Sequence, residues 1–170
     1  MRLYHVPTHP PTWTYTLNWV FIKPSFFWGK TDYIIASGGE QSTSEGFAMY
    51  HTYVIQQNTS SYHLTFATES RRWSMLLPAV PHRWLHVTIT WSAIWGLKYY
   101  EDGRLVKEEV NFELTGSNHT FDEVTIGRPP SIDSVYFAPL TFQISDLVFW
   151  YAFLTEADVT EGFSLSGTWI

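Results

Sequence analysis

The chain has 170 residues, a formal net charge of −6 at pH 7, and more aromatic residues (18%) than charged ones (15%). This length suffices for one core that buries about 70% of the surface exposed by the unfolded chain. The aromatic bias favours half-buried strands and excludes a disordered chain. Lysine and arginine together number only ten against 16 acidic residues, so the sequence offers no basic surface to nucleic acid or anionic lipid.

The chain contains no cysteine, which excludes disulfides, thiol catalysis and thiolate metal sites. No apolar stretch approaches the roughly 20 residues that span a bilayer, so no membrane insertion of this domain is expected. Residues 1–12 are polar and proline-rich and lack the apolar segment of a signal peptide. We therefore expect a loose lead at 1–12 and one domain at 13–170, which would be an excised piece if the protein is secreted.

Alternation of apolar and polar residues dominates the chain. Trp13, Tyr15, Leu17, Trp19 and Phe21 share one face of a run, which is the period-two pattern of a half-buried strand. Further strands are expected at 33–37, 47–55, 62–68, 72–75, 85–91, 97–100, 105–112, 123–127 and 142–150. Asp102-Gly103 is the strongest hairpin signal, because both residues tolerate positive φ.

One short helix is expected near the C-terminus. Thr155 and Asp158 have the spacing of a capping box. In such a box the threonine hydroxyl accepts a hydrogen bond from a backbone amide of the first helical turn, and the acidic side chain interacts with the exposed amide donors and the helix dipole. A last strand is expected from Phe163 to Trp169. The whole pattern predicts an all-β fold.

Several segments resemble a known family. Arg83–Ser92 and Gly96–Val106 are similar to the central hairpin of pentraxin and laminin-G-like domains, within the concanavalin A-like jelly-roll superfamily. Val124–Arg128 and Phe142–Trp150 follow in the family's order, with Leu154–Val159 behind them. The resemblance implies a two-sheet antiparallel β-sandwich (jelly roll) with one short helix near the C-terminus. It also implies an extracellular or cell-surface domain of a larger receptor or secreted protein.

The sequence departs from the pentraxin pattern at the disulfide and at the calcium loop. Thr88 stands where pentraxins have a cysteine, and Ala93 where they have a hydroxyl residue. Pro129, Pro130 and Ser131 follow Arg128, in place of consecutive carboxylate and amide side chains. Calcium takes six to eight oxygen ligands, so we expect the family site to be lost and no cofactor to be bound. Asp133 and Asp146 are the residual metal candidates.

Catalytic carboxylates are not expected. Retaining glycoside hydrolysis needs two acids about 5 to 5.5 Å apart, whereas Glu101-Asp102 and Glu108-Glu109 are adjacent pairs that point to opposite faces of a strand. His86 is expected to be packed or hydrogen-bonded within the sheet. His51 and His63 are expected to be cross-strand neighbours if their strands form a hairpin.

The tryptophans divide into core and binding candidates. Trp19, Trp84, Trp91 and Trp150 lie at alternating strand positions and are expected in the core. Large rings in or beside predicted turns are instead candidates for ligand binding, since they can cap the sandwich, stack on a sugar or anchor a protein partner. The candidates for ligand binding are two tryptophans and one tyrosine, Trp28, Trp95 and Tyr136.

Asn58 and Asn118 are in acceptor sequons for N-glycosylation and are expected in exposed turns. Together with the resemblance, they favour a non-catalytic extracellular recognition or adhesion module that binds a protein partner. A lectin-like carbohydrate-binding module is the alternative. A hydrolase is the third class, but adjacent acidic residues do not give the pair of facing carboxylates that hydrolysis needs.

Overall fold

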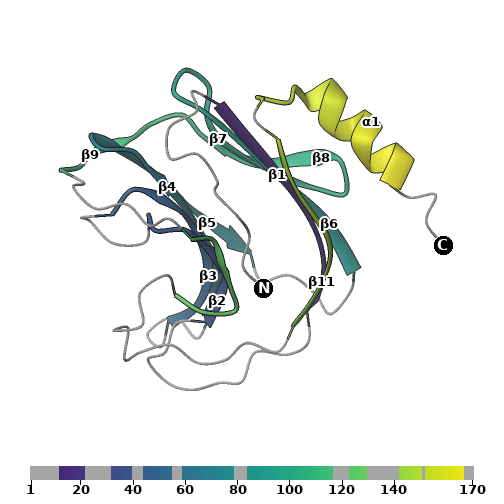
Figure 1. The fold of residues 1–170 in the computed structure, drawn as a ribbon, viewed down its shortest axis with the longest axis horizontal. Helices are drawn as coiled ribbons and strands as arrows, with labels where there is room; N and C mark the ends of the chain where they lie inside the picture. The colour runs from purple at the N-terminus through teal and green to yellow at the C-terminus, as the bar shows by residue number, and fades with distance from the viewer. Residues whose placement is uncertain are drawn as a thin grey trace. The chain divides into compact units, whose positions relative to one another are not determined.

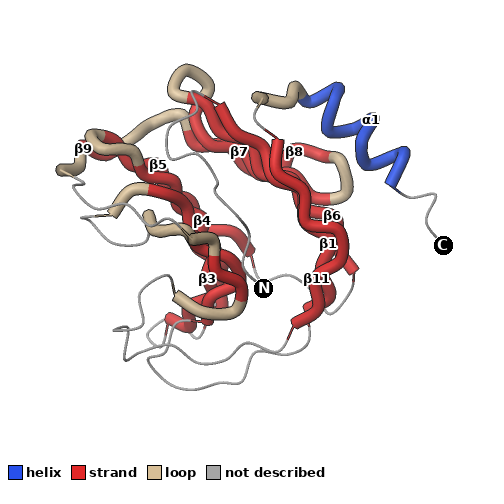
Figure 2. Tube along the Cα trace, viewed as in Figure 1, coloured by secondary structure: helices blue, strands red, loops and turns tan. Residues whose placement is uncertain are grey.

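The computed structural model describes residues 12–21, 32–39, 44–54, 59–78, 84–116, 123–129, 142–150 and 152–166. They fall into two compact units. One unit carries a six-stranded sheet, and the other carries a five-stranded sheet and a helix. Strands make up most of the described residues of both units (Figure 2). Two antiparallel sheets and one short C-terminal helix agree with the expected all-β fold class.

The six-stranded sheet has the order β10-β2-β3-β4-β5-β9. Neighbouring strands are antiparallel throughout, with a register shift between Tyr33 and Ile35. Its strands are β2 (Asp32–Ala36), β3 (Gly46–Val54), β4 (Thr59–Ala67), β5 (Arg71–Pro78), β9 (Glu113–Leu114) and β10 (Thr125–Ile126).

One face of this sheet is a buried apolar layer. In β5 the alternation is visible residue by residue, because Trp73, Met75 and Leu77 are buried while Ser74 and Leu76 are exposed. The same layer contains Phe47, Met49, His51, Tyr62, Leu64 and Phe66, as the cross-strand register requires. We call the opposite face of β3, β4 and β5, with Tyr50, His63, Thr65, Arg72, Ser74 and Leu76, the polar face.

The five-stranded sheet has the order β11-β1-β6-β7-β8. All of its described neighbours are antiparallel, with irregular register between Thr16 and Asn18 and between Tyr99 and Tyr100. Its strands are β1 (Thr12–Phe21), β6 (Trp84–Ser92), β7 (Gly96–Glu101), β8 (Arg104–Glu109) and β11 (Phe142–Trp150).

Strand β6 is buried along almost its whole length. Leu85, Val87, Ile89 and Trp91 form one face of it, and His86, Thr88, Thr90 and Ser92 form the other. The expected core position of Trp91 is confirmed. Trp84 and Trp150, expected in the core, are 54% and 46% exposed, so that interpretation was wrong. Trp84 is the first residue of β6 and Trp150 ends the edge strand β11, where the sheet leaves side chains uncovered.

The helix is longer than expected. Helix α1 (Glu156–Ser166) begins after a capping box in which the Asp158 amide donates to Oγ1 of Thr155 at 3.3 Å, and the Thr155 amide donates to Oδ2 of Asp158 at 2.7 Å. The helix lies beside β8 (Figure 1). The expected strand from Phe163 to Trp169 is therefore wrong for its described part. Val159 is buried and Phe163 contacts the ring of His86, and this four-residue spacing is helical.

No helix in the described ranges is long and apolar enough to cross a membrane.

Candidate binding site

The turn between β6 and β7 holds Trp95, which the sequence marked as a binding candidate. The Trp95 amide donates to Oγ of Ser92 at 2.8 Å, which closes the turn. Gly96 follows with a φ of +72°, and a Cβ there would collide with the carbonyl oxygen of Glu109 on the neighbouring strand. Hydrogen bonding and close packing thus fix the turn on both sides.

This rigid turn carries exposed apolar side chains. Ile94 is 82% exposed and Trp95 is 59% exposed. Val110, just past the end of β8, is 56% exposed, and its Cα lies beside Gly96. We call Ile94, Trp95 and Val110 the apolar tip. Exposed apolar groups gathered on a fixed turn are typical of a surface that binds another molecule.

The other site residues expected from the sequence stay predictions. Trp28, Tyr136, Asp133, Asn58 and Asn118 lie outside the described residues. Asp146 lies within β11, but its side chain is outside the described part. Trp95 is therefore the binding candidate whose surroundings the structure describes.

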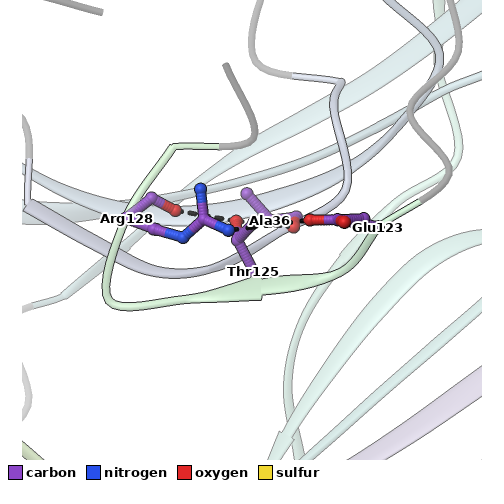
Figure 3. Close-up of polar contacts among 4 residues, drawn as sticks. All are labelled: Ala36, Glu123, Thr125 and Arg128. Atoms are coloured by element: carbon purple, nitrogen blue, oxygen red, sulfur yellow. Dashed lines mark hydrogen bonds and ion pairs between the residues drawn. The ribbon is translucent and has the colours of Figure 1, made fainter. Parts of the chain in front are cut away.

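The turn after β10 is where the resemblance implied the calcium loop (Figure 3). Oγ1 of Thr125 lies 3.1 Å from the carbonyl oxygen of Ala36 and 2.8 Å from that of Arg128, and donates to either. The Gly127 amide donates to the Ile34 carbonyl oxygen at 3.1 Å. A guanidinium nitrogen of Arg128 lies 3.6 Å from a carboxylate oxygen of Glu123.

These contacts bear on metal binding. Arg128 places a fixed positive charge at the start of the loop, beside the one carboxylate of the described turn, and a cation there disfavours Ca²⁺. Across the residues that the structure describes, no three histidine or acidic side chains gather as metal ligands.

His86 is buried and packed within the sheet, as expected. Its amide donates to Oδ1 of Asp102 at 3.1 Å, and its ring lies 5.3 Å from that of Phe163. Burial lowers the pKa of His86, and the Asp102 carboxylate opposes this by favouring the charged ring. His86 therefore has a structural role between the sheet and α1.

The expected pairing of His51 with His63 is wrong by one residue. Strands β3 and β4 do form the hairpin, but His51 stands opposite Tyr62, and His63 stands opposite Tyr50. A one-residue difference places side chains on opposite faces, so His51 is in the buried layer and His63 on the polar face. The rings of Tyr50 and His63 stack with centroids 5.1 Å apart and planes 6° from parallel.

The acids that were weighed as catalytic from the sequence have structural partners. Glu101 accepts a hydrogen bond from the Tyr99 hydroxyl at 3.1 Å, and Asp102 bonds the His86 amide. A carboxylate oxygen of Glu108 lies 3.4 Å from the Lys98 amine. The geometry of these acids matches turn and strand charges and does not form the pair of facing carboxylates that glycoside hydrolysis requires.

The polar face was not predicted from the sequence. Its members come from three strands and are spaced irregularly along the chain, so only strand register brings them together. Alternation within β5 marked Arg72, Ser74 and Leu76 as one face, and that was the available signal.

Solved structures with a similar fold are binding domains and an enzyme. The binding domain of botulinum neurotoxin serotype D/C is similar with a TM-score of 0.63 at 16% identity, covering 92% of this chain and 37% of that one. A structure of botulinum neurotoxin type C, a toxin that depends on two ganglioside molecules to enter cells, is similar with a TM-score of 0.62 at 16% identity, covering 93% and 37%. Trypanosoma rangeli sialidase has a TM-score of 0.58 at 13% identity, covering 92% and 23%.

At these identities the likeness shows the fold alone, and this chain spans little more than a third of the toxin chains. No curated protein is significantly similar to the chain in sequence. The family model of the concanavalin A-like lectin/glucanases superfamily matches residues 5–160. The two antiparallel sheets, the C-terminal helix and this match over most of the chain together place the protein in the concanavalin A-like lectin/glucanases superfamily.

Proposed function

We propose that this domain is a non-catalytic recognition module that binds a protein partner through the apolar tip. The observation that carries the proposal is the exposure of Ile94 and Trp95 on a turn fixed by Ser92 and Gly96. Tryptophan is enriched among the residues that dominate binding energy at protein interfaces. A rigid turn loses little conformational freedom on binding, which favours affinity.

The surroundings of Trp95 favour protein over sugar. Sugar recognition combines a ring with convergent polar groups, but the neighbours of Trp95 at the tip are Ile94 and Val110, and the Ser92 hydroxyl accepts from the Trp95 amide. An apolar pocket on a protein is the complement of such a surface. The net charge of −6 gives no attraction to anionic lipid.

The proposal is tested by photo-crosslinking from the tip. A photoreactive amino acid is placed at position 95, or at position 84 as a control, in the full-length parent protein on cells. Trp84 suits the control because it is also about half exposed and lies at the other end of β6. The captured partner is then purified and its Kd measured for Trp95→Ala and Trp84→Ala.

We expect Trp95→Ala to weaken binding by about tenfold or more, which is the size of a typical hot-spot loss. Trp84→Ala is expected to bind normally. Equal affinity of Trp95→Ala and the unmodified domain would overturn the proposal.

A second candidate is a carbohydrate-binding module. It is favoured by the polar face, where the Tyr50 and His63 rings stand beside hydroxyl side chains. The dependence of neurotoxin type C on gangliosides is consistent with glycan binding on this fold. A glycan array distinguishes the two candidates, because a protein-binding module gives no specific signal on it.

We further propose that the domain belongs to a larger secreted or cell-surface protein and carries glycans on Asn58 and Asn118. The two sequons support this. Intact mass before and after enzymatic deglycosylation, after expression through a eukaryotic secretory route, is the test. An unmodified chain would count against extracellular placement.

A further inference from the structure

The buried apolar layer of the six-stranded sheet comes to the surface beside β9. Trp73 on β5 is 1% exposed, Phe112 is 43% exposed, and Leu114 on β9 is 83% exposed. The rings of Trp73 and Phe112 are in contact, with centroids 5.6 Å apart. Leu114 stands directly opposite Arg71 at the start of β5, and residues opposite each other project from the same face of a sheet. We call Arg71, Phe112 and Leu114, which belong to one compact unit, the β9 patch.

Hydrogen bonds fix the backbone beneath the β9 patch. In the turn from β4 to β5, the Thr68 amide donates to the Arg71 carbonyl oxygen at 2.8 Å, and the Arg71 amide donates to Oγ1 of Thr68 at 3.2 Å. The Thr115 amide, just past β9, donates to the Ser70 carbonyl oxygen at 3.0 Å. The backbone at Arg71 and Leu114 is therefore held in place, and little conformational freedom is lost when a partner binds there.

The exposed Arg71 side chain is oriented by an aromatic ring. Its guanidinium carbon lies 4.4 Å from the centre of the Phe112 ring, which is a cation–π contact. Within the part of the chain that the structure describes, no acceptor bonds the guanidinium N–H donors, and neither Glu69 nor Glu113 forms an ion pair with them. Arg71 is thus a positioned cation whose hydrogen-bond donors can take an acceptor from another molecule.

The charge and composition of the β9 patch define its partner. Arginine and aromatic residues are enriched at protein interfaces, and the arginine fork binds a carboxylate by two parallel hydrogen bonds. Exposed Glu69 and Glu113 flank the patch in sequence and disfavour an extended polyanion such as nucleic acid. Phe112 and Leu114 gain from burial only against apolar groups. We propose that the β9 patch binds a partner protein through an aspartate or glutamate flanked by apolar side chains, with the carboxylate on Arg71.

The β9 patch is a second surface, and its test does not involve the apolar tip. Random linear peptides displayed on phage are selected on the whole 170-residue chain, with counter-selection on Arg71→Gln. We expect the enriched peptides to carry an acidic residue next to leucine, isoleucine or phenylalanine. If no peptide is enriched, or if the enriched peptides lack an acidic residue, the proposal is wrong.

Variants then locate the contact with a synthetic copy of one enriched peptide, after each variant is checked for a folded amide NMR spectrum. Arg71→Gln and Leu114→Ser should each weaken peptide binding by about tenfold or more. Arg71→Lys should also weaken it, because lysine keeps the charge and loses the fork. Replacing the acidic residue of the peptide with its amide should cause the same loss as Arg71→Gln.

Arg104→Gln is the matched control, because Arg104 is also an exposed arginine but lies on β8, in the other unit. Its affinity for the peptide should equal that of the unmodified chain. An equal loss in Arg104→Gln and Arg71→Gln would show general charge attraction in place of a site, and would overturn the proposal.

A second copy of this chain is the other possible occupant of the β9 patch. Sedimentation velocity at the concentration of the binding assay should show a monomer, which supports a different protein as the partner. A dimer that Arg71→Gln converts to a monomer would assign the patch to self-association and contradict the proposal.

Discussion

His86 and Asp102 hold each other through two backbone-anchored hydrogen bonds. The His86 amide donates to Oδ1 of Asp102 at 3.1 Å, and the Asp102 amide donates to the His86 carbonyl oxygen at 2.8 Å. Asp102 has a φ of 48° and Gly103 a φ of 76°, which are the paired positive values of a type I′ hairpin turn. The turn between β7 and β8 is thereby tied to the start of β6.

Asp102→Ala should destabilise the domain by about 1 to 3 kcal/mol, because it removes the acceptor and places a residue with poor tolerance of positive φ in the turn. Asp102→Asn keeps a side-chain oxygen and tolerates that backbone, so it should cost less than half as much. Urea denaturation measures both. Equal losses in the two variants would show that neither a side-chain oxygen nor tolerance of positive φ explains the stabilisation by Asp102.

Trp91→Ala should cost about 3 to 5 kcal/mol, since the indole is 3% exposed and its removal leaves a cavity in addition to the lost transfer energy. Trp95→Ala is the matched control, with a change within about 0.5 kcal/mol, because its ring is mostly in water. Denaturant midpoints compare the two. A near-neutral Trp91→Ala would mean that this indole does not hold the core together.

The glycines at 96 and 162 should respond to alanine with opposite signs. Gly96→Ala should destabilise by about 2 kcal/mol or more, because the positive φ and the Glu109 carbonyl oxygen both exclude a Cβ. Gly162 lies within α1 with nothing within 4 Å of an added Cβ. Gly162→Ala should therefore stabilise by about 0.5 to 1 kcal/mol. Thermal melts of both variants check the pair, and a stable Gly96→Ala would contradict the packing of the turn.

Stability should fall as the pH is lowered from about 7 to about 5. Burial lowers the pKa of His63, with the neighbouring His51 adding to the effect, and burial also lowers that of His86. Below the ordinary histidine pKa of 6.5, the unfolded chain therefore binds protons that the folded chain does not. The stabilisation is fully present above that value and is lost as the pH falls through the lowered values.

His63→Gln should flatten this dependence, and urea midpoints across the same pH range measure it. Hydrogen bonds from Thr155 lower the pKa of Asp158. Any stabilisation by the Asp158 carboxylate is therefore lost at a lower pH and does not affect the slope of stability between about pH 7 and pH 5. An unchanged slope in the variant would exclude His63 as a source.

Millimolar calcium should raise the melting temperature by less than about 2 °C, because a weakly bound ligand adds little to stability. Arg128 at the start of the loop supports this expectation. The control is the same melt with chelator. A rise of many degrees that chelator reverses would mean that Asp133, Asp146 or other residues complete a calcium site.

The sequence by itself determined the strand pattern, the hairpin at Asp102-Gly103 and the family likeness. These follow from short-range rules, because alternation shows which residues share a face, and a turn with positive φ admits few residue types. For the same reason, the start of α1 just after Thr155 was predictable from its capping box.

Only the tertiary structure decided which faces are covered. Alternation predicted a core position for Trp84, Trp91 and Trp150 alike. Burial, however, depends on the position of a strand in its sheet. Trp84 at the start of β6 and Trp150 on the edge strand β11 are therefore exposed, whereas Trp91 is buried. The residues from Phe163 onward alternate like a strand, yet Phe163 packs beside His86 one helical turn after Val159. Thr65 stands opposite Ser74, and Ala67 opposite Arg72, only through the pairing of β4 with β5, because the register between strands is set by contacts that the linear pattern does not contain.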